Sequence, residues 1–220
     1  MSKKRNKNKR KKQPKKNRTK RPVANRTKAS AVLEKLGFEI TRDPIGDEDF
    51  QNLPADVQEQ MEELYYKSQS NSMAAIKELQ DLLLKYPHIP KIYNFLYGAY
   101  MHAGEKTKAI QIMEENYAKN PTYLFARLNY SDYLVEIGEL KKAAEIYDYN
   151  FDLKSLYPKR SVFHITEVIS FFGIIGYYHA MVGNYDEARK CLSVLTAISP
   201  HHDYTLRLKH KINRISTLIA

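Results

Sequence analysis

Three pairs of like residues in this chain are 34 positions apart, namely Pro87 and Pro121, Gly104 and Gly138, and Ala109 and Ala143. A period of this length is typical of chains in which each repeat forms two antiparallel helices. Each helix pair buries its apolar face against the next pair, so such repeats stack into one elongated core. The spacing therefore predicts an all-α fold of stacked helix pairs, which disfavours most enzyme folds.

Apolar periodicity and turn residues divide the chain from residue 54 onward into four helix pairs and a last helix. The two helices of each later pair are separated by a glycine, at Gly104, Gly138 and Gly183. The predicted pairs are 55–67 with 73–86, 91–102 with 106–119, 123–137 with 140–155, and 163–181 with 185–198, followed by a helix at 203–218.

Two of the predicted pairs share an ordered set of aromatic, small and apolar residues that ends in proline. In the second pair these are Tyr93, Leu96, Tyr97, Tyr100, Ala109, Met113 and Pro121, and in the fourth they are Phe172, Ile175, Gly176, His179, Ala188, Leu192 and Pro200. The sequence GNYDEA at 183–188 has the form of the turn between paired helices. In these positions the chain resembles the tetratricopeptide repeat (TPR) family. The resemblance implies an α-α superhelix, a TPR-like solenoid of about four helix pairs with a C-terminal capping helix.

The period is interrupted between the third and fourth pairs. Gly138 and Gly183 are 45 residues apart, which is 11 more than one period. Eleven residues make about three turns at 3.67 residues per turn, so they can lengthen helices without rotating the apolar face. We therefore predict that the helix at 140–155 and the helix after it are both lengthened. Gly173 and Gly176 are expected to let another helix approach closely.

The last predicted helix has apolar and basic residues on different sides. We expect one set of residues to face the array, namely Leu208, Ile212, Ile215 and Ile219, and the basic set to point outward, namely Arg207, Lys209, Lys211 and Arg214. Because a solenoid needs a terminal element with a polar outer face, we interpret this helix as a cap. A dedicated anion-binding face on the same helix is the alternative.

The positive charge of the chain is concentrated in residues 1–28. This segment holds 15 of the 36 Lys and Arg residues and no Asp or Glu, which leaves 21 basic and 25 acidic residues in the rest. With almost no apolar side chains, the segment cannot bury enough surface to offset the entropy lost on ordering. We predict a disordered basic arm at 1–28, an acidic linker with a short helix at 29–53, and a helical repeat domain at 54–220.

The arm is a candidate polyanion-binding segment. Its basic residues attract phosphate through counterion release, and without aromatic residues to stack on bases the binding must be electrostatic. RNA, DNA or the ribosome are the expected partners, and a solubilising tail or, in a eukaryote, a nuclear-import signal are the alternatives. The candidate residues are Lys3, Lys4, Arg5, Lys7, Lys9, Arg10, Lys11, Lys12, Lys15, Lys16, Arg18, Lys20 and Arg21.

The resemblance also implies a concave groove, lined by the first helix of each pair, that binds a protein or peptide partner. The candidate groove residues are Asn94, Phe95, Phe125, Asn129, Asp132 and Tyr177. Chaperone-binding members of the family carry a carboxylate clamp of Lys, Arg and Asn, and here those positions are mostly uncharged, as at Gln60 and Leu64. We therefore expect no recognition of chaperone C-terminal carboxylates. A mixed apolar and amide groove suits a helix or an extended peptide.

Catalytic and metal-binding signatures are missing from the sequence. It has no phosphate loop, dinucleotide-binding glycine motif or metalloprotease helix, and its histidines have no convincing ligand spacing. We expect no enzyme activity, no cofactor and no metal. Some reactive or aromatic side chains are instead assigned to the core, namely His179, Cys191, Tyr65, Tyr66, Tyr147 and Tyr149.

Compartment and assembly are constrained only loosely. A single cysteine allows no intramolecular disulfide and suits a reducing interior, which favours the cytoplasm, or the nucleus in a eukaryote. The most apolar stretch, at 162–182, contains two His and one Glu, so we expect no integral membrane segment. Self-association stays open.

The leading hypothesis is a non-enzymatic scaffold or adaptor that binds a protein partner in its groove and a polyanion through its arm. The alternatives are a structural interaction module with an incidental tail, and an enzyme with an unrecognised site.

Overall fold

The computed structural model describes residues 30–219, with side-chain environments as far as Arg214. The elements are η1 (Glu34–Leu36), β1 (Glu39–Thr41), α2 (Glu48–Gln51), α3 (Ala55–Ser70), α4 (Ser72–Lys85), α5 (Pro90–His102), α6 (Lys106–Lys119), α7 (Leu124–Glu136), α8 (Leu140–Glu145), α9 (Leu153–Leu156), β2 (Val162–His164), α10 (Ile165–Met181), α11 (Tyr185–Ile198) and α12 (Asp203–Ile219). The expected, mostly helical fold is confirmed, and one short two-stranded ladder accompanies it.

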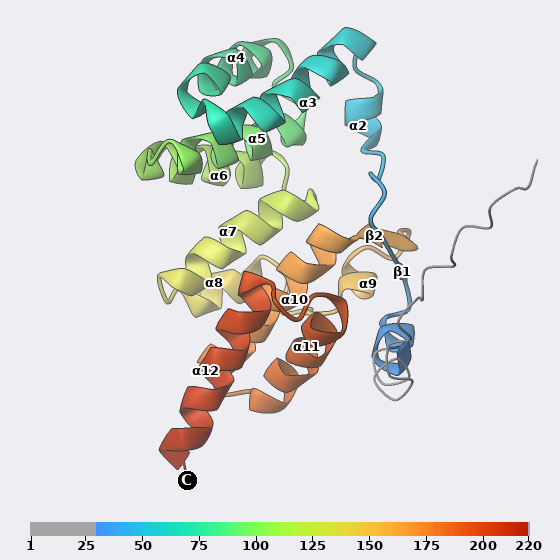
Figure 1. Ribbon diagram of the computed structural model, residues 1–220, viewed down its shortest axis with the longest axis vertical. Coiled ribbons are helices and arrows are strands. Elements are labelled where there is room, and N and C mark those ends of the chain that lie inside the picture. The colour runs from blue at the N-terminus through green and yellow to red at the C-terminus, as the bar shows by residue number, and fades with distance from the viewer. Residues whose placement is uncertain (1–29, 220) are drawn as a thin grey trace, which may run out of the picture.

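The long helices stack in chain order as antiparallel neighbours (Figure 1). The first helices of successive pairs contact one another in the order α3, α5, α7 and α10, and α12 then contacts α10. The second helices α4, α6, α8 and α11 each pack against the first helix of their own pair. Within residues 30–219, no helix combines the length and apolar character needed to span a bilayer.

The same glycine turn joins the two helices of three pairs. Gly104, Gly138 and Gly183 have φ of 75°, 81° and 82°, in the left-handed region that glycine adopts without a steric penalty. The residue after each glycine donates its backbone N–H to a carbonyl one helical turn back, with N···O distances of 2.8–2.9 Å. The 34-residue spacing of Gly104 and Gly138 is therefore the spacing of one repeated turn.

The prediction that the helix at 140–155 is lengthened is wrong, whereas the helix after it, α10, has 17 residues and is longer than α5 and α7 with 13 each. Helix α8 ends at Glu145, because Asp148 and Tyr149 have positive φ values of 50° and 59° that no helix continues through. Tyr147 is fully buried, and its hydroxyl lies 2.8 Å from the Ser131 hydroxyl on α7. This contact holds the chain that follows α8 against α7. The extra residues then form a loop, α9 and β2 before α10 begins.

Residues 38–53, which we call the strap, run along the side of the array and connect its two ends (Figure 1). Strand β1 pairs in parallel with β2, in the register Ile40 with Phe163. Phe38 packs edge-on to Phe163, with ring centroids 4.7 Å apart. At the other end of the strap, Phe50 is buried in the N-terminal core. The segment was predicted to be an acidic linker, and the strand is a feature that the sequence pattern did not indicate.

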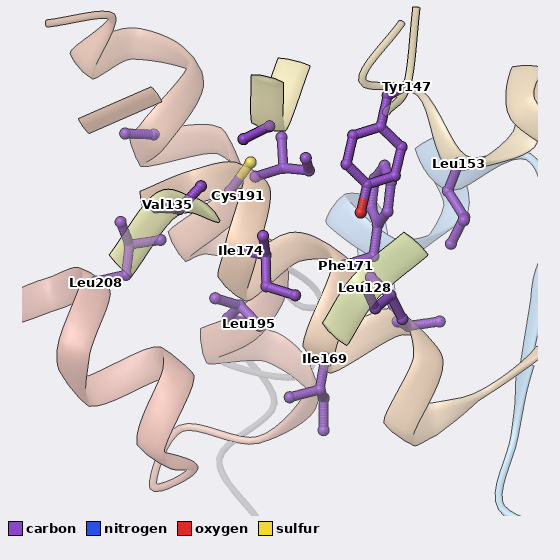
Figure 2. Packing of buried hydrophobic residues seen from close by; sticks show 14 of the residues in the cluster. Leu128, Val135, Tyr147, Leu153, Ile169, Phe171, Ile174, Cys191, Leu195 and Leu208 are labelled. Atoms are coloured by element: carbon purple, nitrogen blue, oxygen red, sulfur yellow. The ribbon is translucent and has the colours of Figure 1, made fainter. Parts of the chain in front are cut away.

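The buried residues form two cores. One lies among α2 to α6, and the other is centred on α10 and extends from α7 to α12. In the second core Tyr147 lies beside Phe171, and Leu208 approaches from α12 on the opposite side (Figure 2). A Cβ on Gly176 would lie 2.5 Å from Leu208 Cδ2, which confirms the expected close helix contact.

Candidate functional site

Helices α3, α5 and α7 share a face that carries an aromatic pair, with one exposed ring and one half-buried ring. Tyr65 on α3 is 45% exposed, and its ring centroid lies 5.2 Å from that of Phe95 on α5. One turn before Phe95, the Lys91 ammonium lies 5.7 Å from the Phe95 centroid and 3.6 Å from that of Phe50. Burial is the main cause that lowers the pKa of Lys91, while nearby Asp47 and Glu62 oppose it. The aromatic pair is therefore bordered by a cation held over a ring.

An amide pair lies next to the aromatic pair on the same face. Asn129 on α7 donates from Nδ2 to Asn94 Oδ1 on α5 at 2.7 Å, which links the first helices of successive pairs. An amide carries two N–H donors and a carbonyl with two lone pairs. This single bond therefore leaves N–H donors and a carbonyl lone pair available on each of the two half-buried side chains. Phe125 is half-buried and lies one helical turn before Asn129 on α7. We call Tyr65, Lys91, Asn94, Phe95, Phe125 and Asn129 the open face.

The rest of the predicted groove is covered by α12. Tyr204 donates its hydroxyl to Asp132 Oδ2 at 2.8 Å, and Arg207 Nη1 lies 3.5 Å from Asp132 Oδ1 and 3.6 Å from Glu136 Oε1. The Arg207 guanidinium also stacks 4.1 Å from the Tyr177 ring centroid. Burial raises the pKa of Asp132, although the Tyr204 hydrogen bond and Arg207 oppose the shift.

The structure thus divides the six predicted groove residues. Asn94, Phe95, Phe125 and Asn129 lie on the open face, and Asp132 and Tyr177 lie under α12. The expectation that the basic residues of this helix point outward agrees with the exposed positions of Lys209 and Arg214. It is wrong for Arg207 and Lys211, because both lie against the Tyr177 ring. They can do so because they are one turn apart on the side of α12 that crosses α10.

The assignment of aromatic residues to the core succeeds in part. Tyr147 is fully buried, whereas Tyr65, Tyr66 and Tyr149 are 45%, 70% and 57% exposed. Helical spacing did place Tyr65 on a first helix. It did not reveal that α3, at the start of the array, has no preceding pair to cover that side.

Few of the described side chains are arranged for metal binding or catalysis. No group of three or more His, Cys, Asp or Glu in the described part of the chain could hold a metal ion. Cys191 is buried, and burial raises the pKa of its thiol to about 12, so little reactive thiolate forms at neutral pH. The predicted polyanion-binding residues, Lys3 to Arg21, lie outside the described residues.

Comparison of the chain with protein-family models, with curated proteins and with solved structures finds no match.

Proposed function

We propose that this chain is a non-enzymatic adaptor of the tetratricopeptide repeat type, which binds an extended segment of a protein partner along the open face. One observation supports this most strongly: the Asn94–Asn129 amide pair lies beside the aromatic pair of exposed Tyr65 and half-buried Phe95. An extended peptide presents backbone N–H and C=O groups that amides can bind, and side chains that can rest on aromatic rings. The open face offers both kinds of contact.

The position of α12 sets the extent of the proposed peptide site. Arg207 and Tyr204 already fill the space over Tyr177 and Asp132. A bound segment therefore spans α3, α5 and α7 and ends before α10. This favours a short, apolar-rich segment over a long helix that would need the whole concave side.

The test is site-specific photocrosslinking in native extract. A photoreactive amino acid at Tyr65 should capture a partner after nuclease treatment, and one at Leu84 should not. Leu84 is the matched control because it is an apolar residue, 83% exposed, on the second-helix layer. Asn94→Ala with Asn129→Ala should lower capture at Tyr65 about tenfold, the usual cost of losing one or two hydrogen bonds. Equal capture at both positions, or capture that survives the double substitution, would refute the proposed site.

A second part of the proposal concerns the basic arm. We propose that residues 1–28 contact RNA, DNA or another polyanion, because this segment holds 15 basic and no acidic residues beside a body with a net excess of acid. Such contacts are electrostatic, so they depend steeply on salt and little on base sequence. A tail that only improves solubility is the competing interpretation.

A further inference from the structure

A cavity of about 820 Å³ lies between the N-terminal segment and the C-terminal core. Its volume falls within the range of small-molecule sites, roughly 300–1,000 Å³. Most of the surface around it is apolar. The apolar lining comes from Val32, Leu36 and Phe38 on one side and from Phe151, Phe172, Ile175 and Val194 on the other.

His179 is the polar group buried most deeply in this wall. It lies on α10, is 9% exposed, and packs edge-on to Phe151 with centroids 5.1 Å apart. Its Nδ1 is buried and has no hydrogen-bond partner among the described residues. A buried polar atom without a partner costs about 1–3 kcal/mol, and the imidazole that carries this atom lines the cavity.

Burial favours the neutral form of the imidazole. Burial is the largest cause that lowers the pKa of His179, and Lys190 adds to this while Glu187 opposes it. A neutral imidazole has one N–H donor and one acceptor nitrogen, so it can bond a hydroxyl, an amine or a carbonyl without charge.

The charges around the cavity balance. Lys35 and Lys190 are basic, Asp152 and Glu187 are acidic, and Lys190 already pairs with Glu187 at 2.6 Å. A ligand with a full charge would meet both signs and would lose its hydration. The lining therefore favours an uncharged molecule.

We propose that this cavity binds an uncharged apolar small molecule that carries one hydrogen-bonding group, which pairs with His179. The apolar body of the ligand rests against Phe151, Phe172 and Ile175. This site is separate from the open face. Its lining comes from residues 32–38 and 149–153 and from α10 and α11, whereas the open face lies on α3, α5 and α7.

The first measurement uses the neutral apolar fluorophore N-phenyl-1-naphthylamine with the full-length chain. Its fluorescence should rise on binding, and Ser193→Trp should weaken the affinity about tenfold by placing an indole at the mouth of the cavity. Thr196→Trp is the matched control. Both residues are exposed on α11 and both bond the carbonyl one turn back, but only Ser193 lines the cavity. Equal binding by the two variants would overturn the proposal.

The second measurement tests the chemistry of the ligand by competition. Decanol should displace the fluorophore about tenfold better than decane or decanoate. In His179→Phe the preference for decanol over decane should disappear while decane still competes. Displacement by decanoate as strong as by decanol would overturn the uncharged character, and a decanol preference that survives in His179→Phe would overturn the role of His179.

The single thiol gives an independent readout of occupancy. Cys191 lines the cavity and is the only cysteine of the chain. Saturating decanol should slow its modification by methyl methanethiosulfonate about tenfold. Unchanged modification in the presence of bound decanol would place the ligand elsewhere and overturn the proposal.

Discussion

Gly173 and Gly176 lie one turn apart on the side of α10 that faces α12. A Cβ on Gly173 would lie 2.5 Å from Tyr204 Cγ, and one on Gly176 would lie 2.8 Å from Cys191 Cβ. These distances leave no room for a methyl group unless a neighbouring helix moves. Gly98 on α5 is different, because nothing lies within 4 Å of its added Cβ. Close packing therefore requires glycine at these positions of α10, whereas the space around Gly98 on α5 would accept a side chain.

We expect Gly176→Ala to destabilise the protein by about 1–3 kcal/mol, the usual cost of overpacking a core. Gly98→Ala is the control and should stabilise it by up to about 1 kcal/mol through helix propensity alone. Urea unfolding of the two variants and the parent measures both. A Gly176→Ala variant as stable as the parent would show that α12 is not held closely against α10.

The burial of His179 leads us to expect that the free energy of unfolding depends on pH. Because burial lowers its folded pKa, the unfolded chain takes up a proton first as pH falls below the ordinary histidine value of about 6.5. Its contribution to stability is therefore present above that pH and is lost below it, by at most about 1.4 kcal/mol per pH unit. Compared with His179→Phe, the parent should lose more stability between about pH 7.5 and 5.5. Equal losses in urea unfolding would contradict the shift.

At the scale of elements, local sequence signals predicted the long helices. Contacts between residues far apart in the chain determine the end of α8, the strand β1 and the position of α12. The bounds of α6 and α11 agree with the sequence analysis, because glycine turns and apolar periodicity mark them directly. The early end of α8 depends on Tyr147 reaching Ser131, a contact with no periodic signal. Strand β1 has three residues, and its partner at Val162–His164 is far along the chain. Likewise Asp132 and Tyr177 were placed correctly on first helices, but the helix that covers them comes later in the chain.

Two neighbouring residues at the start of the strap provide a matched pair of substitutions. Phe38→Ala removes a half-buried ring from Phe163, which is fully buried, and should cost about 1–2 kcal/mol. Glu39→Ala changes the neighbouring exposed side chain and should stay within about 0.5 kcal/mol of the parent. Urea unfolding gives the energies, and hydrogen exchange at Phe163 should accelerate only in Phe38→Ala. Acceleration in both variants would mean that the ladder does not depend on the Phe38 ring.

At the scale of the whole molecule, charge is divided between an arm with 15 basic residues and a remainder with 21 basic and 25 acidic residues. The division separates two kinds of contact, because an acidic body repels the phosphates that the arm attracts. Separate changes to the open face and to the arm should therefore abolish the proposed peptide binding and the proposed polyanion binding independently.

We expect the full chain to bind single-stranded RNA with an affinity that falls about 10³-fold between roughly 50 and 200 mM salt, if six to ten phosphates are engaged. Deletion of residues 1–28 should abolish this binding, and a scrambled arm of the same composition should preserve it. Fluorescence anisotropy with a labelled oligonucleotide measures all three proteins. Binding that survives the deletion would place the contact on the body, and loss in the scrambled chain would mean that the order of residues matters.

The parallel ladder between β1 and β2 also sets an order of events during synthesis. Because the chain is made from its N-terminus, Glu39–Thr41 leave the ribosome long before Val162–His164 exist. The helix pairs α3 to α7 can assemble in that interval from contacts between neighbours in the chain. The strap closes only after most of the protein has been translated. Until then the basic segment ahead of it is joined to the growing chain by an unpaired strand, next to the ribosome that is producing it.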